Sequence, residues 1–522
     1  MASAPAQPAP PIAALAVAGY GAVLGSLFPL MTVLNAADIA GGLSVAGDSA
    51  ALVITMQNIG AVAGILIAPT FAAGIGRGRT MTLTGIGFCV SSVACAIAPS
   101  LAWMLVARFL HGVFGGVLPL MFMLLVMTSL RVGKGQFEGM TLFAASTTLF
   151  FGVAASTGSW LVDCFGWRAL FWAQAIAAIP YAISAAGVLT AEKGRIEMLR
   201  SADWSSNILL SVGLGMILFA LSEGERHFWL EAWWVPGLLS GGTILTGFAA
   251  YNLLRDSQPL LVLAVFRRAT FTWSIILSLF FRFGSLFAIF IVPSYLARIQ
   301  GFRPAEIGLV LASMTPATAM ALITAWAVAQ RFDSRWLLTA GLSCFALASY
   351  LCAGLSSDWA IDQLRMAAFV TGFGMGLFAV AVLRFATFGA TMHDGPTVGV
   401  IFNLARVFGL VCGLAILSHL VAEREKFHSA ILAESLAATD PETTQRLATT
   451  AAAFGRFNAD PAAAMSAAHA ALGRAASAQT FTFAFADAFT VTAFALGLGA
   501  ILVWALPDLP AEHANRPERK PA

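Results

Sequence analysis

Five ionisable side chains of this sequence stand deep inside long apolar runs, where an ionised group is costly. Four of them are Arg108, Arg282, Arg384 and Arg406, and the fifth is His111, three residues after Arg108. Because residues three apart share one face of a helix, Arg108 and His111 are expected to lie side by side. Guanidinium groups bind anions through charge and hydrogen bonds, and histidine exchanges protons near neutral pH. The pattern therefore predicts anion binding and proton transfer.

Each of these residues also has a structural interpretation, and the sequence leaves both open. Arg108 and Arg406 either take part in a transport or proton pathway or brace neighbouring backbone carbonyls. Arg282 and Arg384 either face a cavity and attract an anion or are neutralised by a local partner. His111 either carries a proton or makes a neutral hydrogen bond between helices.

Carboxylates and metal-binding patterns are scarce in the apolar runs. Asp487 stands where the last run begins, so it is either a proton carrier or a favourable charge at a helix N-terminus. The six cysteines show no metal or disulfide spacing and are interpreted as small apolar helix residues. Nucleotide-binding loops and nucleophile triads are also absent from the sequence. We therefore expect no enzyme, no metal, no other cofactor and no nucleic-acid partner.

The elements that must position these residues are fourteen apolar stretches that run through most of the chain. The chain is 59% hydrophobic and only 11% charged. About 20 apolar residues cross a bilayer as a helix, and helices satisfy every backbone amide internally. The sequence thus predicts an all-α polytopic protein with the lipid bilayer as its solvent. The predicted spans are 13–37, 51–72, 81–98, 101–127, 139–162, 168–190, 205–222, 235–254, 271–294, 305–329, 337–354, 364–388, 397–420 and 481–506.

The basic residues of the short links predict the orientation of the chain, because such residues favour the cytoplasmic side. They cluster after the even-numbered spans, which places both termini in the cytoplasm. The first residues, Met1 to Pro11, carry no Lys or Arg and so do not read as a secretory signal. The basic residues assigned to the cytoplasmic side are Arg77, Arg79, Arg131, Lys134, Lys193, Arg195, Arg200, Arg255, Arg267, Arg268, Arg331 and Arg335, with Arg516, Arg519 and Lys520 in the tail.

The spans fall into two helical halves on either side of a middle pair. Residues 1–190 form the first six-helix half, residues 191–268 hold two linking helices, and residues 269–522 form the second half. Arg331, Asp333 and Arg335 follow the second span of the second half, in the place where Gly76-Arg77-Gly78-Arg79 stands in the first. Repeated halves with a site between them near the membrane midplane are typical of secondary transporters.

One link, residues 422–478, is long, charged and rich in Ala and Thr. By the predicted orientation it lies on the periplasmic side. Its stretches around Pro441 and Pro461 are expected to form amphipathic helices. Two roles fit such a segment: it docks a partner, or it caps the outer mouth of the protein itself.

Several motifs, in order along the chain, resemble the fourteen-helix drug:proton antiporters of the major facilitator superfamily, the EmrB/QacA type. The resemblance covers almost the whole chain and implies two six-helix bundles plus two central helices. The matching pieces are Arg108-Phe109-Leu110-His111-Gly112 (R-x-x-Q-G), Trp167-Arg168-Ala169-Leu170-Phe171 (W-R-x-x-F), the run from Tyr295-Leu296 through Gln300-Gly301-Phe302 to Gly308, Asn403-Leu404-Ala405-Arg406-Val407-Phe408-Gly409 (N-x-x-R-x-x-G) and Asp487-Ala488-Phe489 (D-A-F).

The resemblance assigns roles to some positions and fails at others. It implies a substrate or proton pathway at Arg108, His111, Asn403, Arg406 and Asp487. It implies conformational motifs at Gly76, Arg77, Arg79, Gly112, Gly158, Arg331, Asp333 and Arg335. The family's acidic residue of the first helix falls on Phe28 here, the loop motif has Ala73 in place of its Asp, and the fifth-helix antiporter motif has lost its Pro in Ala154-Ala155-Ser156-Thr157-Gly158-Ser159.

Together these features predict a secondary transporter of the bacterial inner membrane that exports amphipathic or weakly acidic drugs or metabolites by alternating access. The proton gradient is the expected energy source. The long link resembles the branch that works with a periplasmic adaptor and an outer-membrane channel. Three alternatives stay open: a cation-exporting multidrug pump using Asp38, Glu138 or Asp487, a polytopic enzyme acting on lipid-linked substrates, and a degenerate, non-transporting membrane partner.

Overall fold

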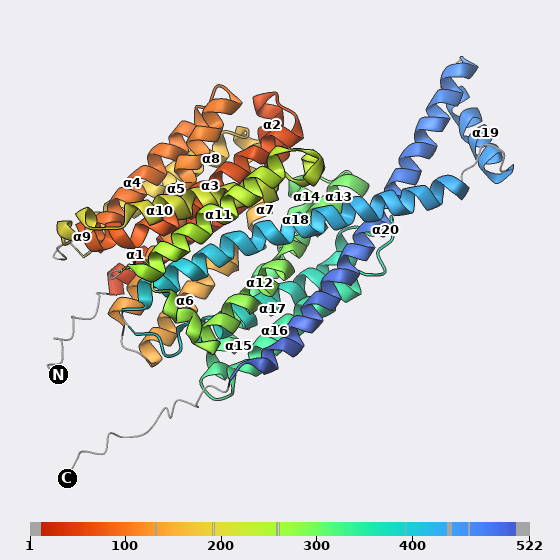
Figure 1. The fold of residues 1–522 in the computed structure, drawn as a ribbon. Helices are drawn as coiled ribbons and strands as arrows, with labels where there is room; N and C mark the ends of the chain where they lie inside the picture. Colours follow the sequence, from red (N-terminus) through yellow and green to blue (C-terminus); the bar gives the residue numbers. More distant parts are fainter. Residues whose placement is uncertain are drawn as a thin grey trace, which may run out of the picture.

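The computed structural model describes residues 12–130, 133–189, 192, 194–256, 259, 261–391, 393–435, 441–457 and 460–507. Every regular element in these ranges is a helix, as the apolar runs predict. The long helices lie side by side in one bundle, and a helical hairpin projects from one end (Figure 1). The predicted tail Met1 to Pro11, Arg131, Lys193 and the basic residues Arg516, Arg519 and Lys520 lie outside the described residues.

The first half holds eight α-helices and is packed through close helix contacts. Gly112 shows why small residues matter here, because a Cβ at this position would collide with the backbone oxygen of Gln57. Gly158 is similarly pressed against the side chain of Asn35. The helices are α1 (Ile12–Leu34), α2 (Ala36–Leu43), α3 (Gly47–Ile75), α4 (Arg77–Ala96), α5 (Leu101–Ser129), α6 (Lys134–Thr148), α7 (Ala154–Phe165) and α8 (Ala169–Gly187).

A linking region and the second half complete the bundle. The short α9 (Ile196–Arg200) precedes the linking pair α10 (Trp204–Glu223) and α11 (Trp234–Arg255). The second half consists of α12 (Ala269–Leu286), α13 (Val292–Ile299), α14 (Pro304–Leu311), α15 (Met314–Ala329), α16 (Ser334–Leu351), α17 (Ile361–Thr387), α18 (Gly395–Ser435), α19 (Pro441–Gly455) and α20 (Pro461–Leu502).

By length and composition, ten of these helices or joined helices suffice to cross a membrane, or eleven if one bent pair is counted. That pair is α6, continued by a 3₁₀ turn (Leu149–Phe151), and α7, and the bend between them is 51°. The single predicted span 139–162 is therefore two helical segments. The helices α4, α11 and α16 occupy three further predicted spans, but they are not among the ten. The count of fourteen stays a prediction.

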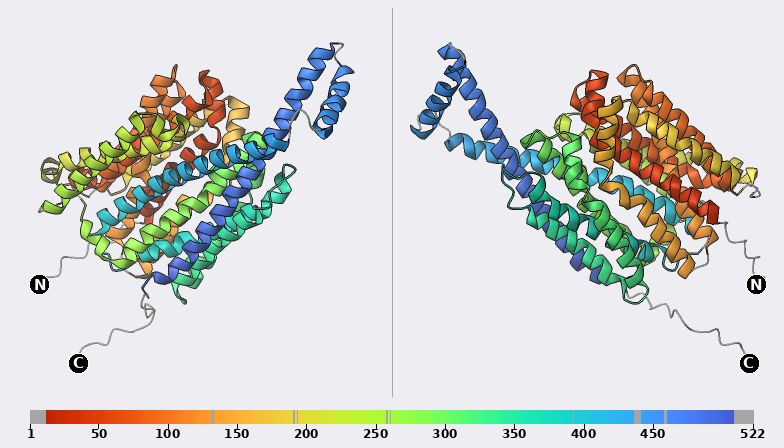
Figure 2. Two further views of the ribbon diagram at one scale, coloured as in Figure 1. Left: turned by 45° about the vertical axis from the view of Figure 1, so that its right-hand side comes forward. Right: turned by 180° about the vertical axis from the view of Figure 1, so that it is seen from behind.

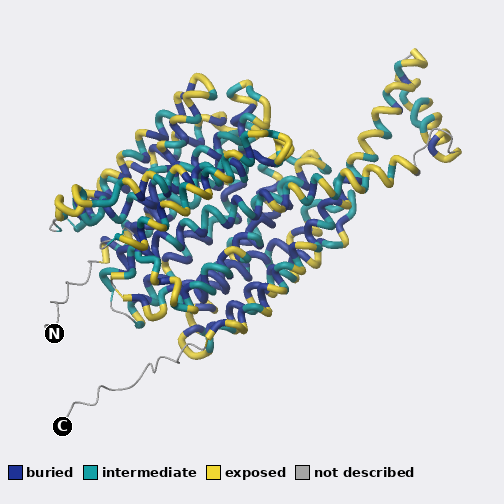
Figure 3. Tube along the Cα trace, viewed as in Figure 1, coloured by how far each residue is buried: buried dark blue, intermediate teal, exposed yellow. Residues whose placement is uncertain are grey.

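Side chains that face neighbouring helices are buried, and those on the outside of the bundle are exposed, as Figure 3 shows. Many of the exposed ones are large and apolar, for example Ile183 and Ile244. An apolar outer surface on a tightly packed core is the arrangement that a lipid environment requires. The burial pattern thus agrees with a membrane protein.

Arg77 holds the first half together at the bundle end where α3 ends and α4 begins, called the inner end here. Its Nε donates to Glu192 Oε1 at 2.6 Å, and its Nη1 donates to Thr128 Oγ1 and Ser129 Oγ at 2.6 Å each. Gly76, just before it, has φ +95°, a conformation that favours glycine. Arg77 therefore ties the α3–α4 turn to the end of α5.

Replacing Arg77 with alanine is expected to destabilise the protein by about 1–2 kcal/mol, because a partly buried carboxylate and two hydroxyls lose their charged donor. The measurement is the midpoint of thermal unfolding in detergent. Arg79→Ala is the control, since Arg79 is exposed and has no ion pair within the described ranges. Equal midpoints for the two variants would contradict the brace.

The second half has a related brace at the inner end. In the first half the arginine stands in the turn between two helices, whereas in the second half it comes from the helix against which that turn packs. Arg384, near the end of α17, donates to the backbone oxygen of Ala329 and, at 3.0 Å, to Ser334 Oγ. Asp333 caps α16 by accepting from the Arg335 backbone N–H at 2.9 Å and pairs with Arg335 Nε at 2.6 Å. The two halves thus share the position of the brace although the donor differs. Arg331 is exposed.

The described part of the predicted long link is helical on both sides of each proline, and its helices form a hairpin. The helices α18 and α20 continue past the bundle, and α19 packs against α20 (Figure 2). Since α20 begins at Pro461, Asp487 lies well inside a helix. The interpretation of Asp487 as a helix N-terminal charge is therefore wrong.

Candidate functional site

A small cavity lies between the two halves, midway along the helices. Its walls come from α6 of the first half and from α12, α17 and α18 of the second. The centre of a water molecule can occupy a volume of about 20 Å³ in this cavity, which is enough room for roughly one water molecule. The lining residues are Phe143, Ala144, Thr147, Thr148, Ser278, Phe281, Arg282, Ala379, Val382, Leu383, Phe402 and Arg406.

Arg282 and Arg406 are the charged residues of this central cavity. Arg282 is 8% exposed, its guanidinium carbon lies 4.7 Å from the ring centre of Phe281, and its Nε has no hydrogen-bond partner. Arg406 reaches across the interface from α18, where its Nη2 lies 3.4 Å from Ser26 Oγ of α1. Its Nη1 lies 3.4 Å from Asn403 Oδ1 on its own helix.

Among the described residues, no carboxylate lies within ion-pair distance of Arg282 or Arg406. Two like charges in a poorly hydrated space repel each other and lose hydration, and an anion between them offsets both costs. Thr147, Thr148 and Ser278 add hydroxyl groups to the same walls. The arrangement therefore presents positive charge and hydroxyl groups that suit a carboxylate or a similar anion at the interface of the halves.

Asn403 and Arg384 are the sequence neighbours of two cavity-lining residues, Phe402 and Leu383, but their own side chains make contacts elsewhere. The Asn403 amide is buried, donates to the Gly399 backbone oxygen at 2.9 Å and lies 3.8 Å from Met123 Sδ of α5. Arg384 does not line the cavity; besides its inner brace, its guanidinium lies 5.9 Å from the ring centre of Phe137 on α6. Asn403 thus joins α18 to α5, and Arg384 belongs to the inner end.

Arg108 and His111 lie inside the first half, away from the central cavity, in a cluster that also contains Gln174 of α8. All three side chains are fully buried. Arg108 Nε lies 3.5 Å from the Val53 backbone oxygen. Among the described residues, both its Nη atoms, both His111 ring nitrogens and both Gln174 amide atoms have no partner in good hydrogen-bond geometry, although His111 and Gln174 are close enough to interact. The His111 ring packs 4.3 Å from that of Phe88.

Buried polar atoms of this kind commonly bind ordered water in proteins. The cluster is therefore not a set of fully satisfied braces. Nothing in the sequence singles out Gln174, because a neutral amide in an apolar run carries neither a charge nor a motif. Its importance comes from the packing of α8 against α4 and α1.

The acidic residues weighed for a cation pump lie elsewhere. Asp487 Oδ2 is 2.6 Å from Arg424 Nε and 2.7 Å from His428 Nε2, between α18 and α20. Asp38 lies on α2 at the outer end, where burial raises the pKa of its carboxyl, with Arg303 acting against and Asp163 adding to the shift. None of these groups, nor Glu138, lines the central cavity.

The two halves meet at both ends of the bundle. At the outer end Arg303 Nη2 lies 2.7 Å from Asp163 Oδ1, and Gly308 of α14 packs so closely on α7 that a Cβ would lie 2.7 Å from the Ser156 nitrogen. We call this α7–α14 contact the outer gate. At the inner end Arg384 covers Phe137, and Gly395 approaches Met127 of α5. The two halves therefore touch at both ends of the bundle, on either side of the central cavity.

Comparison with known proteins agrees with this geometry. The sequence model described as "Major Facilitator Superfamily" matches residues 12–291. The chain is 24% identical to "Multidrug resistance protein Stp" of Mycobacterium tuberculosis over 83% of this chain and 79% of that protein. It is 24% identical to "Fatty acid resistance protein FarB" of Neisseria gonorrhoeae over 78% and 81%. A solved structure of a POT family transporter superposes with a TM-score of 0.59 at 10% identity, over 94% of this chain and 95% of that one.

The family model and the resistance-transporter relatives together identify the chain as a polytopic membrane transporter, and not an enzyme. The chain belongs to the Major Facilitator Superfamily. Within it, the sequence groups with multidrug and antibiotic resistance transporters, so its partners include a small-molecule substrate and the lipid bilayer.

Proposed function

We propose that this protein is a proton-coupled exporter of amphipathic, weakly acidic compounds, working by alternating access at the bacterial inner membrane. The observation that carries the proposal is the pair Arg282 and Arg406 on a cavity between the two halves. An anion bound there contacts both halves at once, since Arg406 also reaches Ser26 of α1. Binding is then linked to the movement of one half against the other.

The chemistry of the cavity favours an acid over a cation. Two guanidinium groups and no carboxylate line it among the described residues, so a cation would meet repulsion without compensation. The aromatic rings of Phe143, Phe281 and Phe402 suit an apolar body attached to the acid. The relative FarB is named for resistance to fatty acids, which are amphipathic acids of this kind.

Proton coupling is assigned to the cluster of Arg108, His111 and Gln174. Its unpartnered nitrogens and oxygens support a site where a proton is held and released as the first half moves. The carboxylates that would otherwise do this are missing, because Phe28 stands at the family's acidic position.

The test is transport in proteoliposomes that contain the purified full-length protein. A radiolabelled aromatic acid should move against its gradient only when a proton gradient is imposed. Dissipation of that gradient with an ionophore should stop it. Movement of a quaternary ammonium dye under the same conditions, with no movement of the acid, would favour the cation pump instead. Movement of neither compound would favour a non-transporting partner.

The projecting hairpin supports a second part of the proposal, a periplasmic adaptor that connects the exporter to an outer-membrane channel. The helix α19 packs against α20 beyond the bundle, and Phe427, Ile431 and Met465 of the hairpin are exposed. An exposed apolar surface on a helical projection is suited to docking another protein.

Replacing α19 (Pro441–Gly455) with a Gly/Ser linker of equal length separates docking from capping. We expect transport in proteoliposomes to be unchanged, because the bundle is intact, and export by living cells to be lost. The measurement compares vesicle uptake with cellular resistance for the same variant. Loss of both would identify the hairpin as a cap over the transporter's own mouth. Retention of both vesicle transport and cellular export would contradict the proposed adaptor.

A further inference from the structure

The halves of the bundle meet along two seams, and one of them is covered. The helix α10 packs against α3 of the first half and α18 of the second. At its outer end, Thr55 Oγ1 donates to Glu223 Oε1 at 2.9 Å. In the following turn, Glu225 Oε2 lies 2.7 Å from His419 Nδ1 of α18. The pair α10 and α11 therefore closes the seam between α3 and α18 against lipid.

Open cavities flank α6 instead, one within the first half and one on the seam between α6 and α15. One of about 610 Å³ lies between α1, α5 and α6, and another of about 450 Å³ lies between α6 and α15. Both are lined by Glu138, Leu142 and Ala145 of α6 and by Leu149 of the 3₁₀ turn that follows it. Leu142 is 58% exposed and Ile323 of α15 is 68% exposed, so these cavities open toward lipid.

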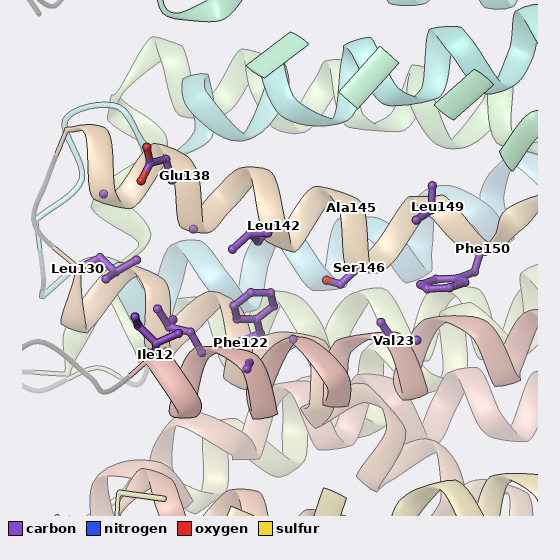
Figure 4. Close-up of a pocket in the computed structure, with 15 residues that line it drawn as sticks. Ile12, Val23, Phe122, Leu130, Glu138, Leu142, Ala145, Ser146, Leu149 and Phe150 are labelled. Atoms are coloured by element: carbon purple, nitrogen blue, oxygen red, sulfur yellow. The ribbon is translucent and has the colours of Figure 1, made fainter. Parts of the chain in front are cut away.

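The larger cavity has the length of one membrane leaflet. On α1 its walls run from Ile12 to Val23, about 17 Å along a helix, against about 15 Å for half of the hydrocarbon core. Figure 4 shows Leu142 and Ser146 of α6 and Phe150 of the following 3₁₀ turn pointing toward α1 across this groove. The groove thus reaches from the inner surface to the middle of the bilayer and fits a single elongated apolar tail.

Glu138 is the ionisable residue of both cavities and lies near the inner start of α6, 3.9 Å from Lys134 Nζ. In Figure 4 it points to the opposite edge of α6 from α1. A carboxylate at the end of an apolar groove repels an anionic head group and accepts a hydrogen bond from a protonated one. The groove therefore fits a long-chain acid in its neutral form, which is the form that dissolves in lipid.

The helix α6 separates this groove from the central cavity. Phe143, Ala144 and Thr147, on its other side, line the central cavity. The helix ends at Thr148, and the 51° bend to α7 follows directly. A change in that bend would connect the two spaces without unfolding a regular helix.

We propose that the α1–α6–α15 groove is a lateral portal through which a protonated, single-tailed carboxylic acid leaves the inner leaflet and reaches Arg282 and Arg406. On the α15 side of α6 the acid's O–H donates to the Glu138 carboxylate. As the acid moves on, its proton passes to Glu138, and the acid is bound at the arginines as the anion. This inference rests on the proposed function and adds the route by which the substrate arrives.

The test uses a palmitic acid analogue with a diazirine in its tail, incorporated into vesicles of phosphatidylethanolamine and phosphatidylglycerol with the full-length protein. Illumination is expected to label residues of α1, α6 and α15. Ala145→Trp should fill the groove and reduce this labelling several-fold, and Leu142→Trp serves as a second groove variant. Leu83→Trp, on the exposed face of α4, should leave labelling unchanged.

Two results would overturn the portal. One is equal labelling of the groove by a phosphatidylethanolamine that carries the same diazirine tail, because the groove would then hold ordinary lipid. The other is unchanged labelling in both tryptophan variants. Transport of benzoate, supplied from water, distinguishes failure of the portal from failure of the proposed function. If only the portal is wrong, the Ala145→Trp variant still transports benzoate. If the proposed function is wrong, the unmodified protein does not transport benzoate either.

Discussion

Arg282→Gln is expected to weaken binding of an acidic substrate by about 10- to 100-fold. The variant removes a charge-assisted hydrogen bond worth about 1.5–3 kcal/mol, and each 1.4 kcal/mol is tenfold in affinity. The same loss is expected for Arg406→Gln, since both guanidinium groups line one cavity. Because the two would hold one anion, the double variant should lose less than the sum of the single losses.

The measurement is the concentration dependence of acid uptake into proteoliposomes. Arg282→Lys should recover part of the affinity, because it restores the charge but not the planar donor. Arg298→Gln is the matched control, since Arg298 is exposed and lies over the Phe481 ring at 4.0 Å, outside the central cavity. A control that falls as far as Arg282→Gln would mean that the effect comes from overall surface charge.

Gly308→Trp is expected to hold the outer gate open and to abolish net transport while leaving the protein folded. A Cβ alone at this position would lie 2.7 Å from the Ser156 nitrogen, so an indole cannot be accommodated in the closed contact. Overpacking of this kind costs about 1–3 kcal/mol, which shifts a two-state equilibrium by about 5- to 150-fold. The shift should favour the state in which α7 and α14 are apart.

Labelling by a water-soluble thiol reagent measures this shift. A cysteine placed at Ser278, on the central cavity, should react faster in the Gly308→Trp background, after the native cysteines are replaced. Gly354→Trp is the control, because a Cβ at Gly354 meets no atom within 4 Å. Unchanged reactivity together with full transport in Gly308→Trp would show that α7 and α14 do not separate during the cycle.

The helical architecture was predictable because lipid imposes a simple rule on each segment separately. A run of apolar residues becomes a helix whatever its neighbours are, so α5, α17 and α12 fall close to the spans predicted for them. Breaks within a run were not predictable. The bend between α6 and α7 occurs where the family's Pro is missing, and it depends on how Gly152 packs against Thr315 of α15.

The type of site was predictable from the sequence, but the residues that line it were not. Deep arginines indicated an anion site, but the sequence could not say which of them share a cavity, because that depends on how each helix is rotated. Arg282 and Arg406 come together, whereas Arg384, which the sequence treats as the equal of Arg282, turns toward the inner end and Ser334. Gln174 carried no signal at all until α8 placed it beside His111.

The sequence also did not predict that a linking helix covers the seam between α3 and α18. The helices α10 and α11 have an apolar composition like the others, so nothing in the sequence indicates that α10 lies over α3 and α18. The partners that fix them, such as Glu223 with Thr55 and Glu225 with His419, are far apart along the chain. Contacts of this kind appear only when the halves are assembled.

The most direct measurement compares an aromatic carboxylic acid with its primary amide, matched in shape but without charge, in proteoliposomes under one proton gradient. Binding between the Arg282 and Arg406 guanidinium groups predicts that the acid is transported and that the amide is not. Equal transport of the two compounds would show that negative charge plays no part in recognition, and it would contradict the anion site between the halves.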